Sequence, residues 1–399
     1  MYQKNYSNRY RNTSRRPNRF GFKRRGSSGG SRNSSIDISK YINRNPEETL
    51  ELAFIPSVNI NDLAVDEKLK YNIQRKGYTQ LTPIQDKAIP LIMNGRDLIG
   101  IANTGTGKTA AFLIPLINKV YLNKQEKVLI IAPTRELAQQ INAEFRSLSQ
   151  GLNIYSTLCI GGTNMYSQRR DLGRPHNFLI CTPGRIKDVA ERKWINLSMY
   201  NNIVVDEVDR MFDMGFQKDI RIILGQLPTA RQTLFFSATV SDNIEALIKS
   251  FLNTPEKVSI NQKISSVNIM QDIIRTDSAH KKIDVLHDIL IKPEYTKVLI
   301  FIKTKWSLNE VEKELIDRGF KVASIHGNKT QGARQRSLSI FKENRTQILL
   351  ATDIAARGLD INNVSHVINY DQPATYNDYI HRIGRTGRGN NKGVALTFI

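Results

Sequence analysis

The sequence predicts an α/β protein of two domains, each a parallel sheet covered by helices, preceded by a basic tail. Two observations support this prediction. Short apolar runs of strand length alternate with longer helical stretches, in two successive series. The chain of 399 residues also exceeds the roughly 250–300 residues at which single hydrophobic cores stop growing, so more than one domain is expected.

The predicted strands fall into two groups along the chain. The first group comprises residues 97–102, 128–132, 178–181, 203–205 and 233–236. The second comprises residues 298–302, 322–325, 347–351, 366–369 and 394–398. Nearly uninterrupted apolar strands between helices are typical of parallel sheets that are buried on both faces. The expected organisation is a tail over 1–38, a lead-in over 39–59, a first domain over 60–260, a linker over 261–266 and a second domain over 267–399.

Composition excludes several classes of protein. No run reaches the roughly 18 apolar residues of a membrane helix, and we expect no signal peptide. Cys159 and Cys181 are too few for a disulfide scaffold and lack the spacing of a metal site. Lys and Arg number 58 against 37 Asp and Glu, a formal net charge of +21. The sequence therefore predicts a cytoplasmic protein with no membrane partner and a polyanionic ligand.

The excess of positive charge is concentrated at the N-terminus. Residues 1–36 hold ten Lys and Arg and no acid, which leaves +11 for residues 37–399. Because the segment has no apolar period, we expect it to be disordered. Its Arg side chains suit phosphate contact, and its interleaved Tyr and Phe side chains suit base stacking. The alternative is a solvated tail that only aids solubility.

A phosphate-binding loop is predicted after the first strand. Residues 103–109 read Asn-Thr-Gly-Thr-Gly-Lys-Thr between a strand and a helical stretch, which is the context of a P-loop. Lys108 is expected to reach the β- and γ-phosphates and Thr109 to ligate Mg²⁺. The alternative is a glycine-rich turn, since Ala102 stands where the strict motif has Gly. The predicted nucleotide contacts of this loop are Thr104, Gly105, Thr106, Gly107, Lys108 and Thr109.

Two acids follow the apolar strand at 203–205. Asp206 is expected to hold Mg²⁺ through water, and Glu207 to polarise the attacking water. In isolation, two surface acids that close a strand would be a credible interpretation. The P-loop upstream favours a catalytic set that contains Lys108, Asp206 and Glu207.

With these sites in place, a series of motifs resembles the DEAD-box family of RNA helicases, a branch of superfamily 2. The similar residues are 77–78, 82–85, 133–137, 161–162, 182–185, 206–209, 237–239, 331, 334, 351–360 and 381–388. The resemblance covers residues 60–399 and implies two tandem RecA-like domains, with Asp-Glu-Val-Asp as a variant of the DEAD motif. Residues 210–216 and 232–237 are most like the bacterial RhlE-like branch.

For the nucleotide, the resemblance implies ATP with Mg²⁺. Gln85 offers a donor and an acceptor to the edge of adenine, and Tyr78 packs beside the base. Asp360 is expected to contact the ribose. Arg385 and Arg388 lie three residues apart in a basic run that, alone, would indicate a nucleic-acid patch. The resemblance makes them arginine fingers on the γ-phosphate and places them in the catalytic set.

The resemblance also implies an RNA-binding set and a coupling set. The RNA-binding residues are Arg135, Gly161, Gly162, Thr182, Arg185, Arg334 and Thr352. They offer guanidinium, hydroxyl and backbone groups to phosphates and 2′-hydroxyls, so binding is expected to be independent of base sequence. The residues expected to couple nucleotide state to domain closure are Asp209, Ser237, Thr239 and His381.

Three positions depart from the family pattern. Ile60 lies 17 residues before Gly77, where relatives commonly carry Phe, which removes an aromatic contact near the adenine. Leu81 replaces Pro and is expected to loosen the local turn. Val208 replaces the Ala of the family name and is expected to add packing while leaving the chemistry intact.

The sequence thus predicts an ATP-dependent RNA helicase. RNA-stimulated ATP hydrolysis would drive domain closure, sequence-independent RNA binding and local unwinding of short duplexes or RNP remodelling. We expect a cytoplasmic monomer that acts with ribosome-assembly or RNA-degradation machinery. The alternatives are a non-processive RNA clamp or scaffold and a DNA translocase of the same superfamily.

Deleting residues 1–36 is expected to weaken RNA binding and to reduce its salt dependence. Each lost phosphate contact lowers the slope of log affinity against log salt by about 0.7 for a single strand. The measurement is fluorescence anisotropy of a labelled RNA across a salt series, with the full chain against the deletion. Unchanged affinity and slope would favour the solvated tail.

Overall fold

The structure is a computed structural model, and it describes most of the chain after the basic tail. The described residues are 36–44, 54–103, 105–260, 269–276, 279–356, 364–387 and 392–399. The predicted linker at 261–266 and residues 1–35 of the predicted tail lie outside them. Asp37 caps a 3₁₀ helix, η1 (Ile38–Tyr41), so ordered structure begins before the predicted end of the tail at residue 38.

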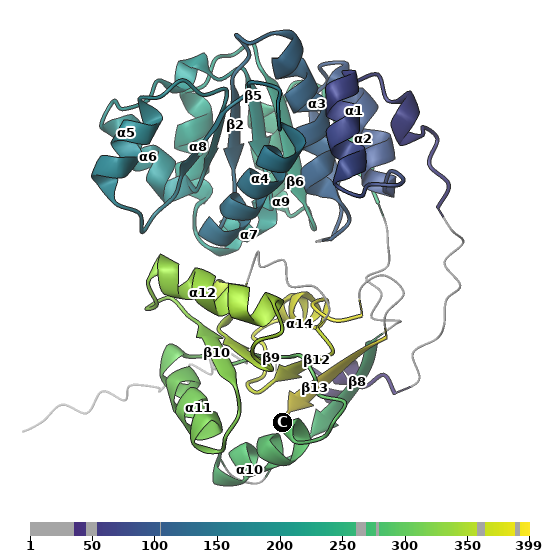
Figure 1. The fold of residues 1–399 in the computed structure, drawn as a ribbon, viewed down its shortest axis with the longest axis vertical. Helices are drawn as coiled ribbons and strands as arrows, with labels where there is room; N and C mark the ends of the chain where they lie inside the picture. The colour runs from purple at the N-terminus through teal and green to yellow at the C-terminus, as the bar shows by residue number, and fades with distance from the viewer. Residues whose placement is uncertain are drawn as a thin grey trace, which may run out of the picture. The chain divides into compact units, whose positions relative to one another are not determined.

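The first domain is built on a seven-stranded sheet in which every neighbouring pair is parallel, in the order β3-β4-β2-β5-β6-β1-β7 (Figure 1). The strands are β1 (Leu98–Ile101), β2 (Val128–Ile131), β3 (Ser156–Cys159), β4 (Phe178–Cys181), β5 (Asn202–Val205), β6 (Gln232–Ser237) and β7 (Glu256–Ser259).

Helices cover both faces of this sheet. They are η2 (Ile60–Asp62), α1 (Glu67–Arg75), α2 (Pro83–Met93), α3 (Lys108–Leu122), α4 (Arg135–Leu148), α5 (Met165–Leu172), α6 (Pro183–Glu191), η3 (Leu197–Met199), α7 (Val208–Asp213), α8 (Gln217–Gly225) and α9 (Asp242–Phe251). Successive residues of a strand point to opposite faces, so Val128 and Ile130 join the core under α1–α4, whereas Leu129 and Ile131 join the core under α6–α9.

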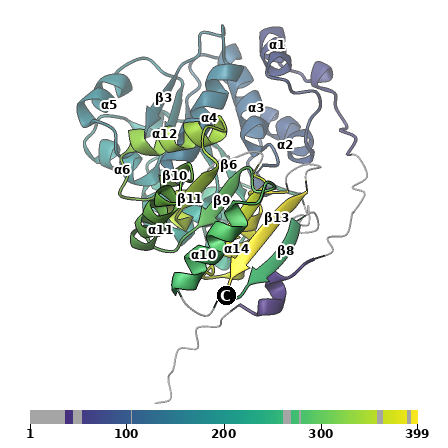
Figure 2. The ribbon, with the colours of Figure 1, turned by 60° about the horizontal axis from the view of Figure 1, so that its bottom comes forward.

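The second domain is built on a six-stranded parallel sheet in the order β10-β11-β9-β12-β13-β8 (Figures 1 and 2). The strands are β8 (Ile269–Ile274), β9 (Val298–Phe301), β10 (Val322–Ile325), β11 (Ile348–Ala351), β12 (His366–Asn369) and β13 (Gly393–Phe398). The helices are α10 (Ala279–Leu290), α11 (Lys305–Asp317), α12 (Gln331–Lys342), α13 (Asp353–Ala356) and α14 (Tyr376–Ile383). Helices α10 and α11 share one hydrophobic core with the sheet, and α12 and α14 lie on its other side in Figure 1.

The prediction of two parallel-sheet domains is confirmed. All ten predicted strands are present, with ends that differ by at most one residue. Three strands were not predicted, and all three lie at the edge of a sheet: β3, β7 and β8. Edge strands are less buried, as the alternating burial of β3 shows, so they lack the continuous apolar run that marks the central strands. Among the described residues, no helix is long and apolar enough to cross a membrane.

Strand register in the first domain places its functional loops together. Strand β6 lies between β5 and β1, and all three run in the same direction. Ile101 at the end of β1 pairs with Ser237 at the end of β6, and Val205 at the end of β5 pairs with Phe235. The loops that follow the three strands therefore emerge at one edge of the sheet.

Gly100→Ala is expected to destabilise the first domain by roughly 1–3 kcal/mol, because overpacking forces a core to shift. A Cβ at Gly100 would lie 2.5 Å from the ring of Phe236, which packs at 5.4 Å from the Phe112 ring. The measurement is denaturant unfolding. Gly225→Ala is the matched control, because a Cβ there meets no atom within 4 Å, and no loss of stability is expected. Equal effects of the two substitutions would contradict this account.

Candidate functional site

The P-loop sits between β1 and the N-terminus of α3. Gly105 and Gly107 adopt positive φ angles of 87° and 93°, a conformation that side chains disfavour. The Thr106 hydroxyl donates to the Asn103 carbonyl at 2.8 Å and so closes the loop on itself. The first backbone N–H groups of α3 have no partner within the helix, which makes this helix end suited to phosphate oxygens. Thr104 lies outside the described residues.

Lys108 is buried at the first position of α3, with only 6% of its surface exposed. Its Nζ donates to the Ala102 carbonyl at 2.7 Å, so the ammonium lies under the loop and is paired with the loop's own backbone. Thr109 follows on the first turn of the helix and is half-buried. The structure therefore places both predicted phosphate and metal contacts at the same helix end.

The two acids after β5 are buried beside each other and differ in their electrostatics. Burial raises the pKa of Asp206 to about 7, and Glu207 adds to this rise while Lys108 opposes it. Burial would likewise raise the pKa of Glu207, but Arg210 outweighs it with the help of Lys108 and Arg385, and the pKa is lowered. Glu207 is therefore the acid that stays ionised.

An ion pair fixes the Glu207 side chain. Arg210 Nη1 lies 2.7 Å from Glu207 Oε2, and both side chains are at most 6% exposed. Glu207 also has a positive φ of 52° at the start of α7, a backbone conformation that costs of order 1–3 kcal/mol in a residue other than glycine. The backbone N–H of Glu207 donates to Asp206 Oδ1 at 2.9 Å, which holds the strained turn in place.

The residues at this edge suit a magnesium ion. The donors are hard oxygens, one hydroxyl of Thr109 and one carboxylate of Asp206. In the described part of the chain, no group of three or more His, Cys, Asp and Glu side chains could hold a metal alone. A metal bound here would need further oxygens from water and nucleotide phosphates, which is the usual mode of Mg²⁺.

The three predicted coupling residues of the first domain form one hydrogen-bonded cluster. Asp209 Oδ2 accepts from the backbone N–H groups of Ala238 and Thr239 at 3.1 and 3.0 Å, and from the Thr239 hydroxyl at 3.1 Å. The Ser237 hydroxyl accepts from the Asp209 N–H at 3.3 Å and donates to the Thr239 carbonyl at 2.6 Å. The loops after β5 and β6 are thereby joined.

Gln85 is almost fully buried and joins α2 to the P-loop. Its Oε1 accepts from the Thr82 backbone N–H at 3.0 Å, and its Nε2 donates to the Gly107 carbonyl at 3.1 Å. Sequence reasoning missed this contact between Gln85 and the P-loop. Each end of the amide has capacity for one more partner, so the predicted recognition of adenine stays a prediction.

Tyr78 and Ile60 line an open cavity of about 510 Å³ together with Gln74 and Thr79. The Tyr78 hydroxyl donates to Glu144 at 2.7 Å, and burial raises its pKa. Ile60 is 4% exposed and packs in the core of the domain.

The other two departures from the family pattern are also buried. Leu81 is 2% exposed and belongs to the same core as Ile60. Val208 is fully buried in the core under α6–α9, which agrees with the packing expected of it.

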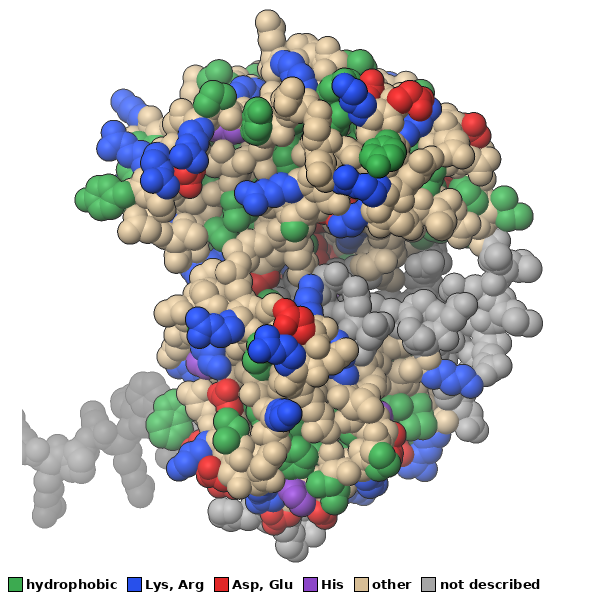
Figure 3. Space-filling model, viewed as in Figure 1, with side chains coloured by type: hydrophobic (Ala, Val, Ile, Leu, Met, Phe, Trp, Pro, Cys, Tyr) green, Lys and Arg blue, Asp and Glu red, His purple; other side chains and the backbone are tan. Residues whose placement is uncertain are grey.

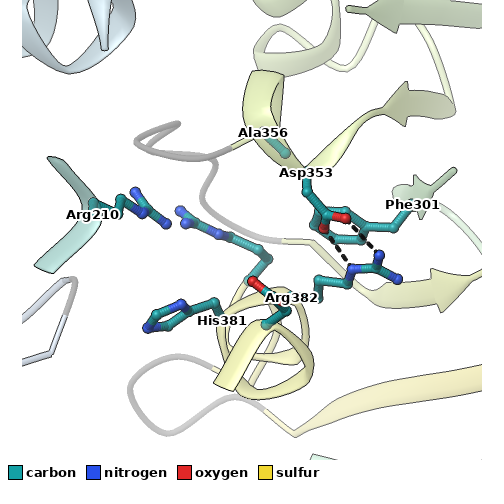
Figure 4. Close-up of a pocket in the computed structure, with 8 residues that line it drawn as sticks. Arg210, Phe301, Asp353, Ala356, His381 and Arg382 are labelled. Atoms are coloured by element: carbon teal, nitrogen blue, oxygen red, sulfur yellow. Dashed lines mark hydrogen bonds and ion pairs between the residues drawn. The ribbon is translucent and has the colours of Figure 1, made fainter. Parts of the chain in front are cut away.

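The basic motif of the second domain, residues 381–388, begins on α14 (Figure 4). Arg382, which was not among the predicted site residues, forms a bidentate ion pair with Asp353, with both N–O distances at 2.7 Å. It also donates to Asn369 Oδ1 and to the Asp371 carbonyl. This pair ties the start of α13 to α14 and orients the residues that follow.

Arg385 is 4% exposed and lines a pocket with Arg210 and His381. Figure 4 shows Arg210 pointing from α7 toward the residues of α14. Burial lowers the pKa of His381, and the nearby Arg210 lowers it further, so the imidazole stays neutral. The predicted contacts Arg388 and Asp360 lie outside the described residues.

Part of the predicted RNA-binding set is assembled in the first domain. The Arg135 guanidinium lies against Gly161 and Gly162, and a Cβ at Gly161 would lie 3.1 Å from Arg135 Nη2. A side chain at either glycine would therefore force the Arg135 guanidinium to move. Arg185 Nη1 donates to Gln168 and lies 3.5 Å from the Thr163 hydroxyl, which brings it to the same loop. Lys and Arg side chains gather nearby, over α5 and α6 (Figure 3).

The remaining predicted RNA contacts are engaged with protein atoms. Thr182 is buried where α6 begins, and the Thr352 carbonyl accepts from two backbone N–H groups of α13. Arg334 Nη2 lies 2.9 Å from Glu136 of the first domain, to which Gln331 Nε2 also donates at 3.2 Å. Glu136 lies within the motif at 133–137 and in the first turn of α4, but it was not among the predicted site residues.

Comparisons with known proteins match both domains. The protein-family model described as DEAD/DEAH box helicase matches residues 82–247, and the family model described as helicase conserved C-terminal domain matches residues 281–390. The chain is 41% identical to ATP-dependent RNA helicase CshA of Listeria monocytogenes over 85% of this chain and 65% of that protein, and so spans just under two thirds of its length. It is 40% identical to DEAD-box ATP-dependent RNA helicase CshA of Geobacillus kaustophilus over 85% and 73%.

A solved structure of S. cerevisiae Dbp5 bound to RNA and ADP BeF3 is also similar. It is 30% identical with a TM-score of 0.75, and the match covers 86% of this chain and 89% of that chain. Both bacterial relatives carry the name CshA, and the RhlE-like placement stays a prediction.

Arg210→Met is expected to lower the free energy of unfolding by about 3–5 kcal/mol, because it leaves the buried Glu207 carboxylate unpaired. The measurement is denaturant unfolding of the full chain. Arg192→Met is the matched control, since it breaks a largely exposed pair with Asp188 that is worth at most about 1 kcal/mol. A small effect of Arg210→Met would show that Glu207 finds another partner or is solvated.

Proposed function

The chain belongs to the DEAD-box family of ATP-dependent RNA helicases, and from that membership we propose that it hydrolyses ATP in response to RNA and remodels short RNA structures. One observation carries the proposal. Lys108, Asp206 and Glu207 are buried together at one edge of the first sheet, and the charge of Arg385, from the second domain, reaches Glu207.

The nucleotide site would act through groups already in position. Lys108 would exchange the Ala102 carbonyl for β- and γ-phosphate oxygens, and the N–H groups at the start of α3 would take the others. Thr109 and Asp206 would hold Mg²⁺, which supplies charge neutralisation at the phosphates. Glu207, kept ionised by Arg210, would accept a proton from the attacking water.

Hydrolysis would depend on both domains. Arg385 would stabilise the charge that develops on the transferred phosphoryl group, a contribution worth about 10³–10⁵ in rate where NTPases use an arginine finger. The Asp209 cluster joins the loops after β5 and β6, so a shift at either would pass to the other. These contacts support the proposed link between nucleotide state and domain closure.

RNA would be bound through its backbone. Arg135, Arg185 and Arg334 carry the charge for phosphate contact, and the set contains no side chain that points to base recognition. The similarity to a Dbp5 structure bound to RNA supports this assignment. We propose local unwinding or RNP remodelling as the outcome, with ribosome-assembly or RNA-degradation machinery as the setting, in a cytoplasmic monomer. An RNA clamp and a DNA translocase are the outcomes that would replace this proposal.

The decisive experiment measures ATPase activity with and without RNA for the wild type and Glu207→Gln. RNA is expected to stimulate the wild type. Glu207→Gln is expected to lower the stimulated kcat by about 10²–10⁴-fold, because the general base is lost. Glu191→Gln, on an exposed position of α6, is the matched control and should leave kcat unchanged.

Three results would overturn the proposal. An ATPase indifferent to RNA would contradict it, and stronger stimulation by duplex DNA would favour the translocase. Tight RNA binding without any hydrolysis would favour the clamp.

A further inference from the structure

The segment Asp37–Arg44 precedes the first domain in sequence but contacts the second domain. It adds a short antiparallel pairing to the edge strand β8, in which the Asn43 N–H donates to the Gln271 carbonyl at 2.8 Å and the Gln271 N–H donates to the Asn43 carbonyl at 2.9 Å. Figures 1 and 2 both show the purple η1 beside β8. The segment thus covers part of an otherwise open sheet edge.

An ion pair fixes the register of this contact. Arg44 binds Asp272 through two hydrogen bonds, from Nε to Oδ2 at 3.1 Å and from Nη2 to Oδ1 at 3.0 Å. Hydrogen bonding from Arg44 lowers the pKa of Asp272. The pair is exposed, so its contribution is to geometry more than to stability.

Tyr41 is the buried part of the segment, with 1% of its surface exposed. Its ring packs edge-on against Tyr379 of α14 at 4.8 Å between centroids. The Tyr379 hydroxyl in turn donates to Gln271 Oε1 at 2.9 Å, and Lys40 lies over the Tyr376 ring at 5.2 Å. The Tyr41 hydroxyl is buried with no hydrogen-bond partner, so the aromatic ring carries the contact.

Helix α14 is the element that positions the basic motif. Arg382 on this helix is held by Asp353 at the start of α13, and Arg385 follows two residues after the helix ends. Tyr379 lies one turn before Arg382, so Tyr41 and Asp353 restrain neighbouring turns of the same helix. Removing the Tyr41 ring would free the first of these turns.

We infer that residues 37–44 act as part of the second domain and that Tyr41 is a positioning residue. By packing on α14, Tyr41 would hold Arg385 in the position that hydrolysis requires. The inference rests on the proposed function, since it assigns Arg385 a role in turnover. It gives the segment before the first domain a role in catalysis that is separate from any role of the basic residues before it.

The test compares Tyr41→Ala, Tyr41→Phe and Ile42→Ala in the full chain. Tyr41→Ala should lower RNA-stimulated kcat several-fold and leave the KM for ATP unchanged, because the P-loop and Gln85 lie in the first domain, whereas Arg385 is assigned to the transition state. Tyr41→Phe should retain wild-type kcat, because it keeps the ring and removes only the unpartnered hydroxyl. Ile42→Ala is the matched control, since Ile42 is 40% exposed, and should also behave as wild type.

Hydrogen exchange separates positioning from general loss of stability. Tyr41→Ala should speed amide exchange across Tyr376–Ile383 and leave α12 of the same domain unchanged. Asn43→Pro, at a half-buried position, removes one backbone hydrogen bond to β8 and should reduce kcat to a lesser degree, which covers the case in which Tyr41→Ala fails to fold.

Two results would overturn the inference. One is wild-type kcat in Tyr41→Ala and Asn43→Pro, and the other is faster exchange that is equal in α12 and α14. A wild type without RNA-stimulated ATPase would refute the proposed function instead, so the two failures are distinguishable.

Discussion

Charge burial at the edge of a parallel sheet is the constraint on which the rest of the site depends. A charged side chain taken out of water is stable only when paired, and the ends of β1, β5 and β6 bring several such groups together. Lys108 is paired with the Ala102 carbonyl, Glu207 with Arg210, and Asp209 with the N–H groups of the neighbouring loop. The strand register therefore determines which loops meet, and the pairing determines how each side chain points.

The same constraint explains where the backbone takes positive φ angles. Gly107 and Glu207 directly precede α3 and α7, and both have a positive φ, which strains the backbone only at Glu207. At Gly107 the absence of a side chain lets the Gln85 amide pack onto the loop, where a Cβ would lie 2.5 Å from Nε2. At Glu207 the strain is held by the hydrogen bond to Asp206 and by the ion pair with Arg210. Both turns reverse the chain at the edge of the sheet, so that Lys108 and Glu207 lie close to it instead of pointing away along the strand direction.

Sequence reasoning predicted the features that a short run of residues encodes, and it missed the contacts between residues that lie far apart in the sequence. The central strands, the P-loop and the acids after β5 each follow from a short run of residues. Edge strands such as β3 were not predicted, because only every second residue of β3 is fully buried and the strand therefore lacks a continuous apolar run. The ion pair of Arg382 with Asp353 joins residues 29 positions apart, and Tyr41 meets Tyr379 from the opposite end of the chain. Arg334 was assigned to RNA from its motif, yet its partner here is Glu136 of the other domain.

The pairing of Arg334 also bears on how ligands would act. Two basic groups of the second domain interact with acids of the first: Arg334 with Glu136 through an ion pair, and Arg385 with Glu207 through its charge. Phosphates of RNA and ATP would meet the same guanidinium groups, so each ligand would compete with a carboxylate rather than fill an unpaired site. The free energy gained on binding would then be a difference between two ion pairs, and so smaller than for a guanidinium without a carboxylate partner. The proposed cycle of binding and release would therefore exchange one ion pair for another at each of these guanidinium groups.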